Sequence, residues 1–388
     1  MRIAVSRDPD AEREVSPLEL FFDLVYVFAI SQLSHHLVEH VDLRTGAETA
    51  VLALAVFYAW YMVAWGANWL DPDPLPVRAM LVGLMFASLL MSVAIGDAFG
   101  DRAWLFVTGY LVLHVARAAF LIVALRGRPQ SEHFVNDLVW EVLTGVLWVA
   151  GAVAGPDARL VLWGLAVAAG YGGAWAQHWL PGRGRRVDLD HTEIAGGHLV
   201  ERFRLFFIIV LGETVLTMGT AFAAEPFALE RLLALAIGFA GTVGLWWSYF
   251  QRSEGLGVEA AERADDPGAV GLWGTWTLTL IVLGLIAIAV ADELAIAHPG
   301  DDATLGFTLL AFGGPALFLL AQLLFQRAAL GRAPRSRAVG LAALAVLAVA
   351  TAPLTLIAGI AASSAVVIAV AITDTGRADG VEARITAA

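Results

Sequence analysis

Long apolar runs recur along this chain of 388 residues, and each of the longer ones can cross a lipid bilayer. About 20 residues of α-helix cover the ~30 Å hydrocarbon layer. The first run, residues 18–38, is almost entirely aliphatic or aromatic. Because hydrocarbon offers no hydrogen-bond partner to free backbone groups, such runs must be helical. The pattern therefore predicts an all-helical protein that crosses the membrane many times.

Twelve such runs predict twelve membrane helices, in a possible arrangement of six plus six. Eleven helices is the alternative, because the last two runs are short and separated only by a turn that we place at Pro353. We expect a cytoplasmic tail over 1–17, a first helical half over 18–180, a linker over 181–199, a second half over 200–372 and a tail over 373–388. The predicted spans are 18–38, 47–69, 76–97, 103–125, 134–154, 159–180, 200–221, 228–250, 270–292, 304–326, 338–351 and 354–372.

The starts of the two halves share a short pattern. Glu19 and Phe21 open the first predicted helix, and Glu201 and Phe203 open the seventh in the same orientation. Transporters often contain internal repeats of this kind. Two matching residues also fit a chance similarity between two amphipathic helix starts, so both interpretations stay open.

Composition supports the membrane class and excludes several activities. Hydrophobic residues make up 59% and charged residues 15% of the chain, against roughly 45–50% and 25% in a soluble domain. All 24 basic residues are arginine, so a retinal Schiff base and a P-loop lysine are both excluded. Without cysteine there is no thiolate chemistry and no disulfide. The basic residues are not gathered into a patch, so we expect the lipid bilayer as partner, no nucleic acid and no cofactor.

The arginine distribution predicts the orientation. With twelve spans and a cytoplasmic N-terminus, seventeen arginines fall in inside segments and four fall in outside segments, namely Arg44, Arg102, Arg159 and Arg231. Membrane proteins concentrate arginine on the cytoplasmic side. We therefore expect a multi-pass protein of the cell membrane with both termini in the cytoplasm. The apolar run after the N-terminal tail is too long for a signal peptide, which favours a retained first helix.

Three motifs carry a resemblance to a known family. They are ELFFDLVYVFAISQLSHHL (Glu19 to Leu37), NWLDP (Asn68 to Pro72) and HLVERFRLFFIIVLGETVL (His198 to Leu216). The chain resembles the low temperature requirement protein A (LtrA) family of bacterial polytopic membrane proteins. The resemblance implies an integral membrane protein named for a cold-growth phenotype and brings no biochemical activity with it. The supporting site candidates are Glu19, Ser34, His35, Asn68, Asp71, Glu201 and Arg202.

Polar residues deep in the predicted spans are the main functional candidates, because a buried charge costs ~2.5–3.5 kcal/mol or more and must find a partner or water. Counted by helical rise, five of them fall within about two turns of one another in depth. They are Asp23, His114, Arg117, Glu141 and Glu213. The set predicts either a structural network that orders the bundle or a pathway for protons or ions.

Arg117 gives the sharpest expectation within this set. Guanidinium cannot lose its proton, so Arg117 should form an ion pair with at least one of Glu141, Asp23 and Glu213. Glu141 lies at matching depth on the next helix and is the expected structural partner. Glu213, on the same helical face as Arg202, is then the expected proton carrier.

Two further patterns suggest metal sites that we expect not to form. His36, Glu39 and His40 spell the inverted zinc-protease signature at the end of a membrane helix, without an evident further ligand. Asp188, Asp190, His191, Glu193 and His198 cluster in the polar linker, where a solvated loop is the simpler explanation. The glycines Gly238, Gly241 and Gly244 of the eighth span, with Gly151 and Gly155, predict close helix packing.

Three functions remain open at this point. The first is a transporter or channel for a small solute or ion, coupled to protons or not. The second is a non-transporting membrane protein that supports growth in the cold. The third, an intramembrane metal-dependent hydrolase, is the least favoured, so we expect no enzymatic activity.

The orientation can be tested directly, because the chain has no native cysteine to give a background signal. We predict that segments 183–186 and 332–337 are cytoplasmic. Single cysteines introduced there should resist membrane-impermeant thiol reagents in intact cells, whereas a cysteine in the predicted outer loop 293–303 should label. Prompt labelling of the first two segments would reverse the orientation.

Overall fold

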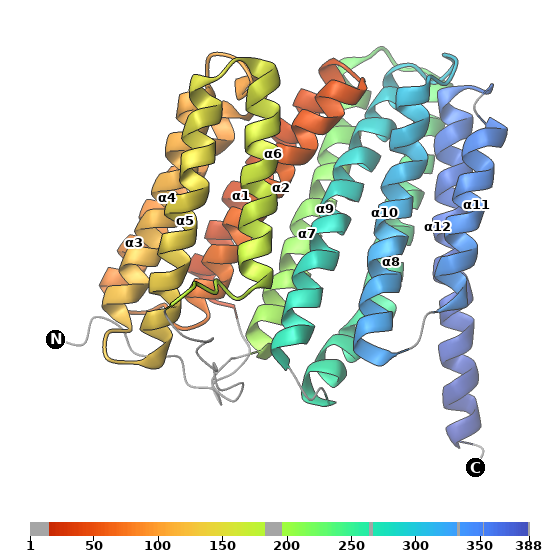
Figure 1. Cartoon of the computed structure of the whole chain (residues 1–388). Coiled ribbons are helices and arrows are strands. Elements are labelled where there is room, and N and C mark those ends of the chain that lie inside the picture. Colours follow the sequence, from red (N-terminus) through yellow and green to blue (C-terminus); the bar gives the residue numbers. More distant parts are fainter. Residues whose placement is uncertain (1–14, 183–195, 264–266, 332–333, 352, 387–388) are drawn as a thin grey trace. The chain divides into compact units, whose positions relative to one another are not determined.

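The computed structural model describes residues 15–182, 196–263, 267–331, 334–351 and 353–386. These ranges contain twelve α-helices, one short 3₁₀ turn and no β-strand, which confirms the predicted helical class (Figure 1). Pro353 lies in the turn between the last two helices, as predicted. The elements are α1 Pro17–Glu39, α2 Leu43–Ala67, α3 Leu75–Ala94, η1 Ile95–Asp97, α4 Ala103–Ala124, α5 Pro129–Val153, α6 Pro156–Trp175, α7 Gly196–Ala224, α8 Leu229–Arg263, α9 Pro267–Ala297, α10 Leu305–Leu330, α11 Arg335–Thr351 and α12 Leu356–Thr386.

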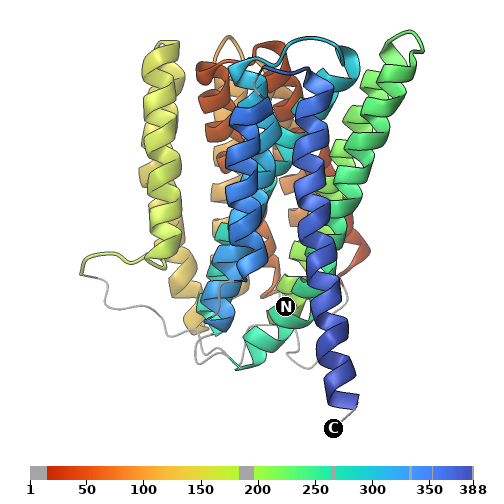
Figure 2. The ribbon, with the colours of Figure 1, turned by 90° about the vertical axis from the view of Figure 1, so that its right-hand side faces the viewer.

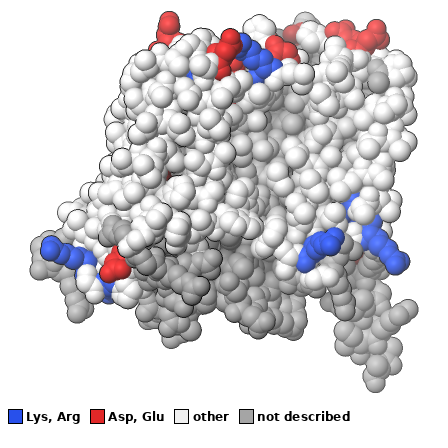
Figure 3. All heavy atoms as spheres, in the orientation of Figure 1, with Lys and Arg blue, Asp and Glu red and all other residues white. Residues whose placement is uncertain are grey.

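Ten of the described helices are long and apolar enough to cross a membrane. The two others are α6, whose first turn carries Asp157 and Arg159, and α11, which has only 17 residues. Large apolar side chains are exposed along the helices: Phe21, Val146 and Val349 expose 58%, 63% and 79% of their surface. In Figure 3 the charged side chains lie near the helix ends and the stretch between them is uncharged. These features are typical of surfaces that face lipid.

The chain divides into two compact units. The first unit comprises the chain up to His36 together with Arg44–Phe206, and the second comprises Leu37–Leu43 together with the chain from Phe207 onward. The division falls within α7, so the first turns of this helix belong to the first unit. The division at the linker into halves over 18–180 and 200–372 remains a prediction, and so does the internal repeat.

In the first unit, consecutive helices pack side by side from α3 to α6 (Figure 1). Helix α1 begins with a capping box, in which the Ser16 amide donates to the Glu19 carboxylate (2.9 Å) and the Glu19 amide donates to the Ser16 hydroxyl (3.3 Å). Prolines open α5 and α6, where their missing N–H is harmless. Aromatic rings fill the interior, as where Trp60 stacks on Phe206 with centroids 3.9 Å apart.

In the second unit, α9 packs along α10, and α12 packs against α8 and α11 (Figures 1 and 2). Helix α10 begins at a cap where the Thr304 side chain accepts from the Phe307 amide (3.2 Å), and it ends at Gly331 in the left-handed conformation (φ 64°). Helices α9 and α10 approach closely at Gly284 and Gly314. A Cβ atom added to either glycine would lie 2.6–2.8 Å from the backbone oxygen of the other.

This close approach gives a matched pair of variants on one helix. Gly314→Ala should push α9 and α10 apart and destabilise the protein by about 1–3 kcal/mol, as overpacking does. Gly313→Ala is the control, because a Cβ atom there would meet nothing within 4 Å. Thermal unfolding of the purified protein in detergent should show a lower Tm for the first variant alone. Equal Tm values for the two variants would contradict the close contact.

Candidate functional site

Helix α5 carries a polar stripe on one face, formed by every fourth residue: His133, Asp137 and Glu141. Residues four apart lie one above the other on a helix. On the neighbouring helix α4, His114 and Arg117 lie three residues apart and point to this stripe. Apart from the half-buried His133, all of these side chains are buried. The two helices therefore place ionisable groups against each other inside the first unit.

Arg117 is held by two carboxylates. Its Nη2 atom donates to Oδ2 of Asp137 at 2.8 Å and lies 3.6 Å from Oε1 of Glu141. The predicted pair of Arg117 with Glu141 is confirmed. The direct hydrogen-bonding partner is nonetheless Asp137, and this corrects the assignment of Glu141 as the principal structural partner. Glu141 Oε1 lies instead 2.9 Å from Nδ1 of His114.

His178 extends the cluster from the turn that follows α6. Its Nε2 atom lies 3.6 Å from Oδ1 of Asp137, and its ring lies 5.5 Å from that of His133. Gln177 and His178 both have positive φ angles, 51° and 52°, which residues other than glycine adopt rarely. Strained backbone of this kind concentrates at functional sites. We call His114, Arg117, His133, Asp137, Glu141 and His178 together the α4–α5 network.

Aromatic rings enclose one side of the α4–α5 network. Tyr58 from α2 stacks on the His114 imidazole with centroids 5.4 Å apart, and Tyr110 lies 4.3 Å from the same ring. Both tyrosines are buried. The low polarity of this wall strengthens electrostatic interactions within the network, because little solvent screens them.

Several polar atoms of the α4–α5 network have no hydrogen-bond partner among the described protein groups. They include Nε2 of His114, both ring nitrogens of His178, Nε and Nη1 of Arg117 and Oδ1 of Asp137. Most buried polar groups in proteins are hydrogen-bonded to protein or to water. In a network that only stabilises the fold, every polar atom should have a hydrogen-bond partner. The atoms without one therefore favour a site that takes up protons or water.

The charges of the α4–α5 network do not balance. Asp137 and Glu141 carry two negative charges when ionised, and Arg117 supplies one positive charge. Isolated charges are costly in a medium of low polarity. One additional positive charge, such as a bound proton, would restore neutrality. The arrangement is therefore suited to hold one exchangeable proton.

A second buried cluster in the first unit joins α1, α2 and α7. Arg202 forms a short ion pair with Asp23, which also accepts a 2.7 Å hydrogen bond from the Trp60 indole. Arg202 is fully buried. Nearby, His198 lies 3.2 Å from the Glu19 carboxylate and 3.1 Å from the Asn68 side-chain oxygen.

This second cluster unites all three motifs of the sequence. Glu19 and Asp23 belong to the first motif, Asn68 to the second, and His198 and Arg202 to the third. A family model described as "Bacterial low temperature requirement A protein (LtrA)" matches residues 14–372. The chain belongs to the LtrA family. A protein of Rhizobium meliloti (strain 1021) described as "Uncharacterized protein RA0937" is 34% identical over 331 residues, which cover 84% of this chain and 80% of that protein. No solved structure matches the chain.

The other predicted residues of this LtrA chain lie apart from both clusters. Glu213 belongs to the second unit, where its carboxylate accepts a 3.1 Å hydrogen bond from Thr217 one turn along α7. Ser34 is buried and His35 is exposed on α1. Asp71 accepts from the Asp73 amide (3.0 Å), and Glu201 pairs with Arg204 (2.8 Å).

Of the two metal-like patterns, only that of His36, Glu39 and His40 lies wholly within the described ranges. Those ranges contain no group of three or more histidine or acidic residues placed to hold a metal ion. His36 lies 3.6 Å from Glu48 of α2 and is not grouped with Glu39 and His40. The linker cluster from Asp188 to Glu193 lies outside the described residues, and His198 is bound to Glu19 and Asn68 as above.

Sequence reasoning missed Asp137, His133 and His178. The fifth span was predicted to begin at residue 134, and Asp137, three residues further on, was not singled out. The helix begins at Pro129, which places Asp137 in its third turn and buries it. The spacing of four between His133, Asp137 and Glu141 was the available signal. His178 follows the helix in a turn and had no comparable signal.

The main ion pair can be tested with a double-mutant cycle. Arg117→Ala and Asp137→Ala should each leave a buried charge unpaired and destabilise the protein by about 3–5 kcal/mol. The double variant should be more stable than the sum of the two losses predicts. Thermal unfolding of the detergent-solubilised protein measures the three values. Strictly additive losses would show that the two side chains do not interact.

Proposed function

We propose that this LtrA protein is a transporter or channel for a small solute or ion, and that the α4–α5 network binds the proton that drives or accompanies transport. The observation that carries the proposal is the network's incomplete pairing together with its unbalanced charge. Ionisable residues inside membrane bundles are rare and commonly mark proton relays and ion pathways. A network that served assembly alone would have no reason to keep acceptors and donors unpaired.

Within this proposal the residues have different roles. Asp137 holds the Arg117 guanidinium by a direct hydrogen bond and stays ionised. Glu141 lies closer to His114 than to Arg117, at 2.9 Å against 3.6 Å, so these two groups are the better placed to exchange a proton. His178 continues the chain of titratable groups toward the end of α6. The cluster of Asp23 and Arg202 also leaves Asp23 Oδ2 and Nε and Nη1 of Arg202 without a hydrogen-bond partner among the described groups. We assign it to packing because Asp23 accepts from the Trp60 indole and its ion pair with Arg202 joins α1 to α7.

The proposal also includes the location, the orientation and the kind of activity of the protein. The protein resides in the cell membrane with both termini in the cytoplasm, because the arginine-rich segments should face that side. Within the proposal the network binds and passes on protons and performs no covalent chemistry. Within the proposal Glu213 is a second proton carrier, and it belongs to the second unit.

The proposal is tested with purified protein in liposomes that contain a pH-sensitive dye, challenged with a panel of ions and small solutes. The wild-type protein should produce a solute-dependent proton signal. Glu141→Gln preserves shape but removes the titratable group, so it should fold normally and abolish this signal.

Asp157→Asn is the matched control, because Asp157 is an exposed acid of the same unit that pairs with Arg44 at the surface. It should leave transport unchanged. Absence of flux for every solute and ion would reject the transporter, and an undiminished proton signal in Glu141→Gln would reject the α4–α5 network as its proton site.

A further inference from the structure

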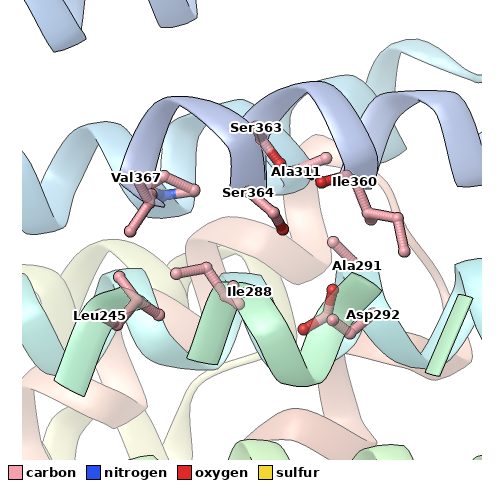
Figure 4. Close-up of a pocket in the computed structure, with 12 residues that line it drawn as sticks. Leu245, Ile288, Ala291, Asp292, Ala311, Ile360, Ser363, Ser364 and Val367 are labelled. Atoms are coloured by element: carbon pink, nitrogen blue, oxygen red, sulfur yellow. Dashed lines mark hydrogen bonds between the residues drawn. The ribbon is translucent and has the colours of Figure 1, made fainter. Parts of the chain in front are cut away.

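The second unit contains a small cavity between α8, α9, α10 and α12 with a volume of about 20 Å³. This is room for one water molecule or one small ion, since a water requires roughly 10–15 Å³ on the same measure. The walls are mainly apolar, with Leu245 and Ile288 among them. The polar exceptions are Asp292, Ser363 and Ser364 (Figure 4).

Asp292 is the unusual member of this cavity. Its side chain is only 4% exposed, and it makes no hydrogen bond or ion pair with any residue in the described part of the chain. Figure 4 shows its carboxyl group turned toward Ser364 across the cavity. A buried carboxylate without a partner is costly, so Asp292 requires a proton or a cation beside it.

The neighbouring groups supply further oxygen atoms. The Ser364 hydroxyl has no partner among the described residues, whereas Ser363 donates to the Ile360 carbonyl of its own helix at 3.2 Å. Pro315 lies inside α10 and has no N–H to give to the carbonyl of Ala311, one turn earlier. Ala311 itself lines the cavity. Helix α10 is continuous, and the missing hydrogen bond leaves the Ala311 carbonyl available as an oxygen ligand.

The space for an ion exists because α8 presents glycine at this level. A Cβ atom at Gly238 would lie 3.1 Å from the Asp292 carboxyl carbon, and one at Gly241 would lie 2.5 Å from the Ser364 hydroxyl oxygen. The predicted close packing at these glycines is therefore confirmed. The same glycines leave the oxygen atoms of α9 and α12 uncovered by any side chain of α8.

We propose that Asp292, Ser364 and the Ala311 carbonyl form a binding site for a single Na⁺ ion. One carboxylate balances one monovalent charge. Mg²⁺ retains several waters and Ca²⁺ binds six to eight oxygen ligands that include several carboxylates, whereas this cavity offers a single carboxylate. Carboxylate, hydroxyl and carbonyl oxygens are ligands that suit a small monovalent cation such as Na⁺. Counted by helical rise, Asp292 lies ~7.5 Å from the end of α9 at Ala297, within reach of the membrane surface.

The proposed site adds to the proposed function, because it identifies Na⁺ as an ion that a transporter of this kind would carry or use for coupling. Only that role rests on the transport proposal. Binding of the ion follows from the cavity and its oxygen atoms, and it can be measured without any transport.

Equilibrium binding of ²²Na⁺ to the purified full-length protein in detergent tests the site. The wild-type protein should bind one Na⁺ saturably, and Na⁺ should raise the Tm relative to choline at equal ionic strength. Asp292→Asn should abolish both effects, and Ser364→Ala should weaken binding by about tenfold or less, as the loss of one hydroxyl ligand would.

Asp302→Asn is the matched control, because it makes the same charge change at an exposed acid of the same unit. It should bind Na⁺ as the wild-type protein does. No saturable Na⁺ binding by the wild-type protein, or unchanged binding by both Asp292→Asn and Ser364→Ala, would overturn the site. Because the assay needs no flux, Na⁺ binding without transport would reject the proposed function and retain the site.

Discussion

The cost of a buried guanidinium shapes both units of this protein. Arg117, Arg202 and Arg337 are almost completely buried among apolar helices. Arginine cannot become neutral by losing its proton, so each one needs a carboxylate that remains ionised. In every case the partner is an aspartate on another helix: Asp137, Asp23 and Asp374 respectively. These pairs determine which helix faces meet, because a mismatch would leave a charge unpaired in a medium of low polarity.

Once the arginines are paired, the remaining acids are available to bind a proton or a cation. In the first unit Glu141 lies 2.9 Å from His114 and 3.6 Å from the same Arg117 Nη2 atom that donates to Asp137. In the second unit Asp292 has no ion pair with an arginine of the described residues and faces a cavity. In the proposals made above, an acid that accepts a direct hydrogen bond from a guanidinium keeps its charge. An acid without such a bond can exchange a proton or bind a cation.

The buried charged residues that the sequence did not identify lie at the ends of the predicted spans. Asp137, Asp292 and Asp374 all fell at or just outside the predicted ends of apolar spans, and Arg337 was assigned to a cytoplasmic segment. The helices extend beyond the apolar runs: α9 continues to Ala297 and α11 begins at Arg335. Hydropathy marks where side chains can face lipid, but helices continue wherever neighbouring helices cover polar residues. The residues at these edges are therefore buried in protein, where pairing outweighs their polarity.

By itself the sequence determined the class of the protein, its twelve helices, its family and the deep positions of His114, Arg117 and Glu141. These features depend on local composition and periodicity, because a helix in a membrane must satisfy its backbone internally. Only the tertiary structure decided which charges meet. Asp23 and Arg202 lie 179 residues apart, and the cavity at Asp292 needs four helices and the glycines of α8. Such contacts follow from how faces pack, and the spacing of residues along one chain does not contain that information.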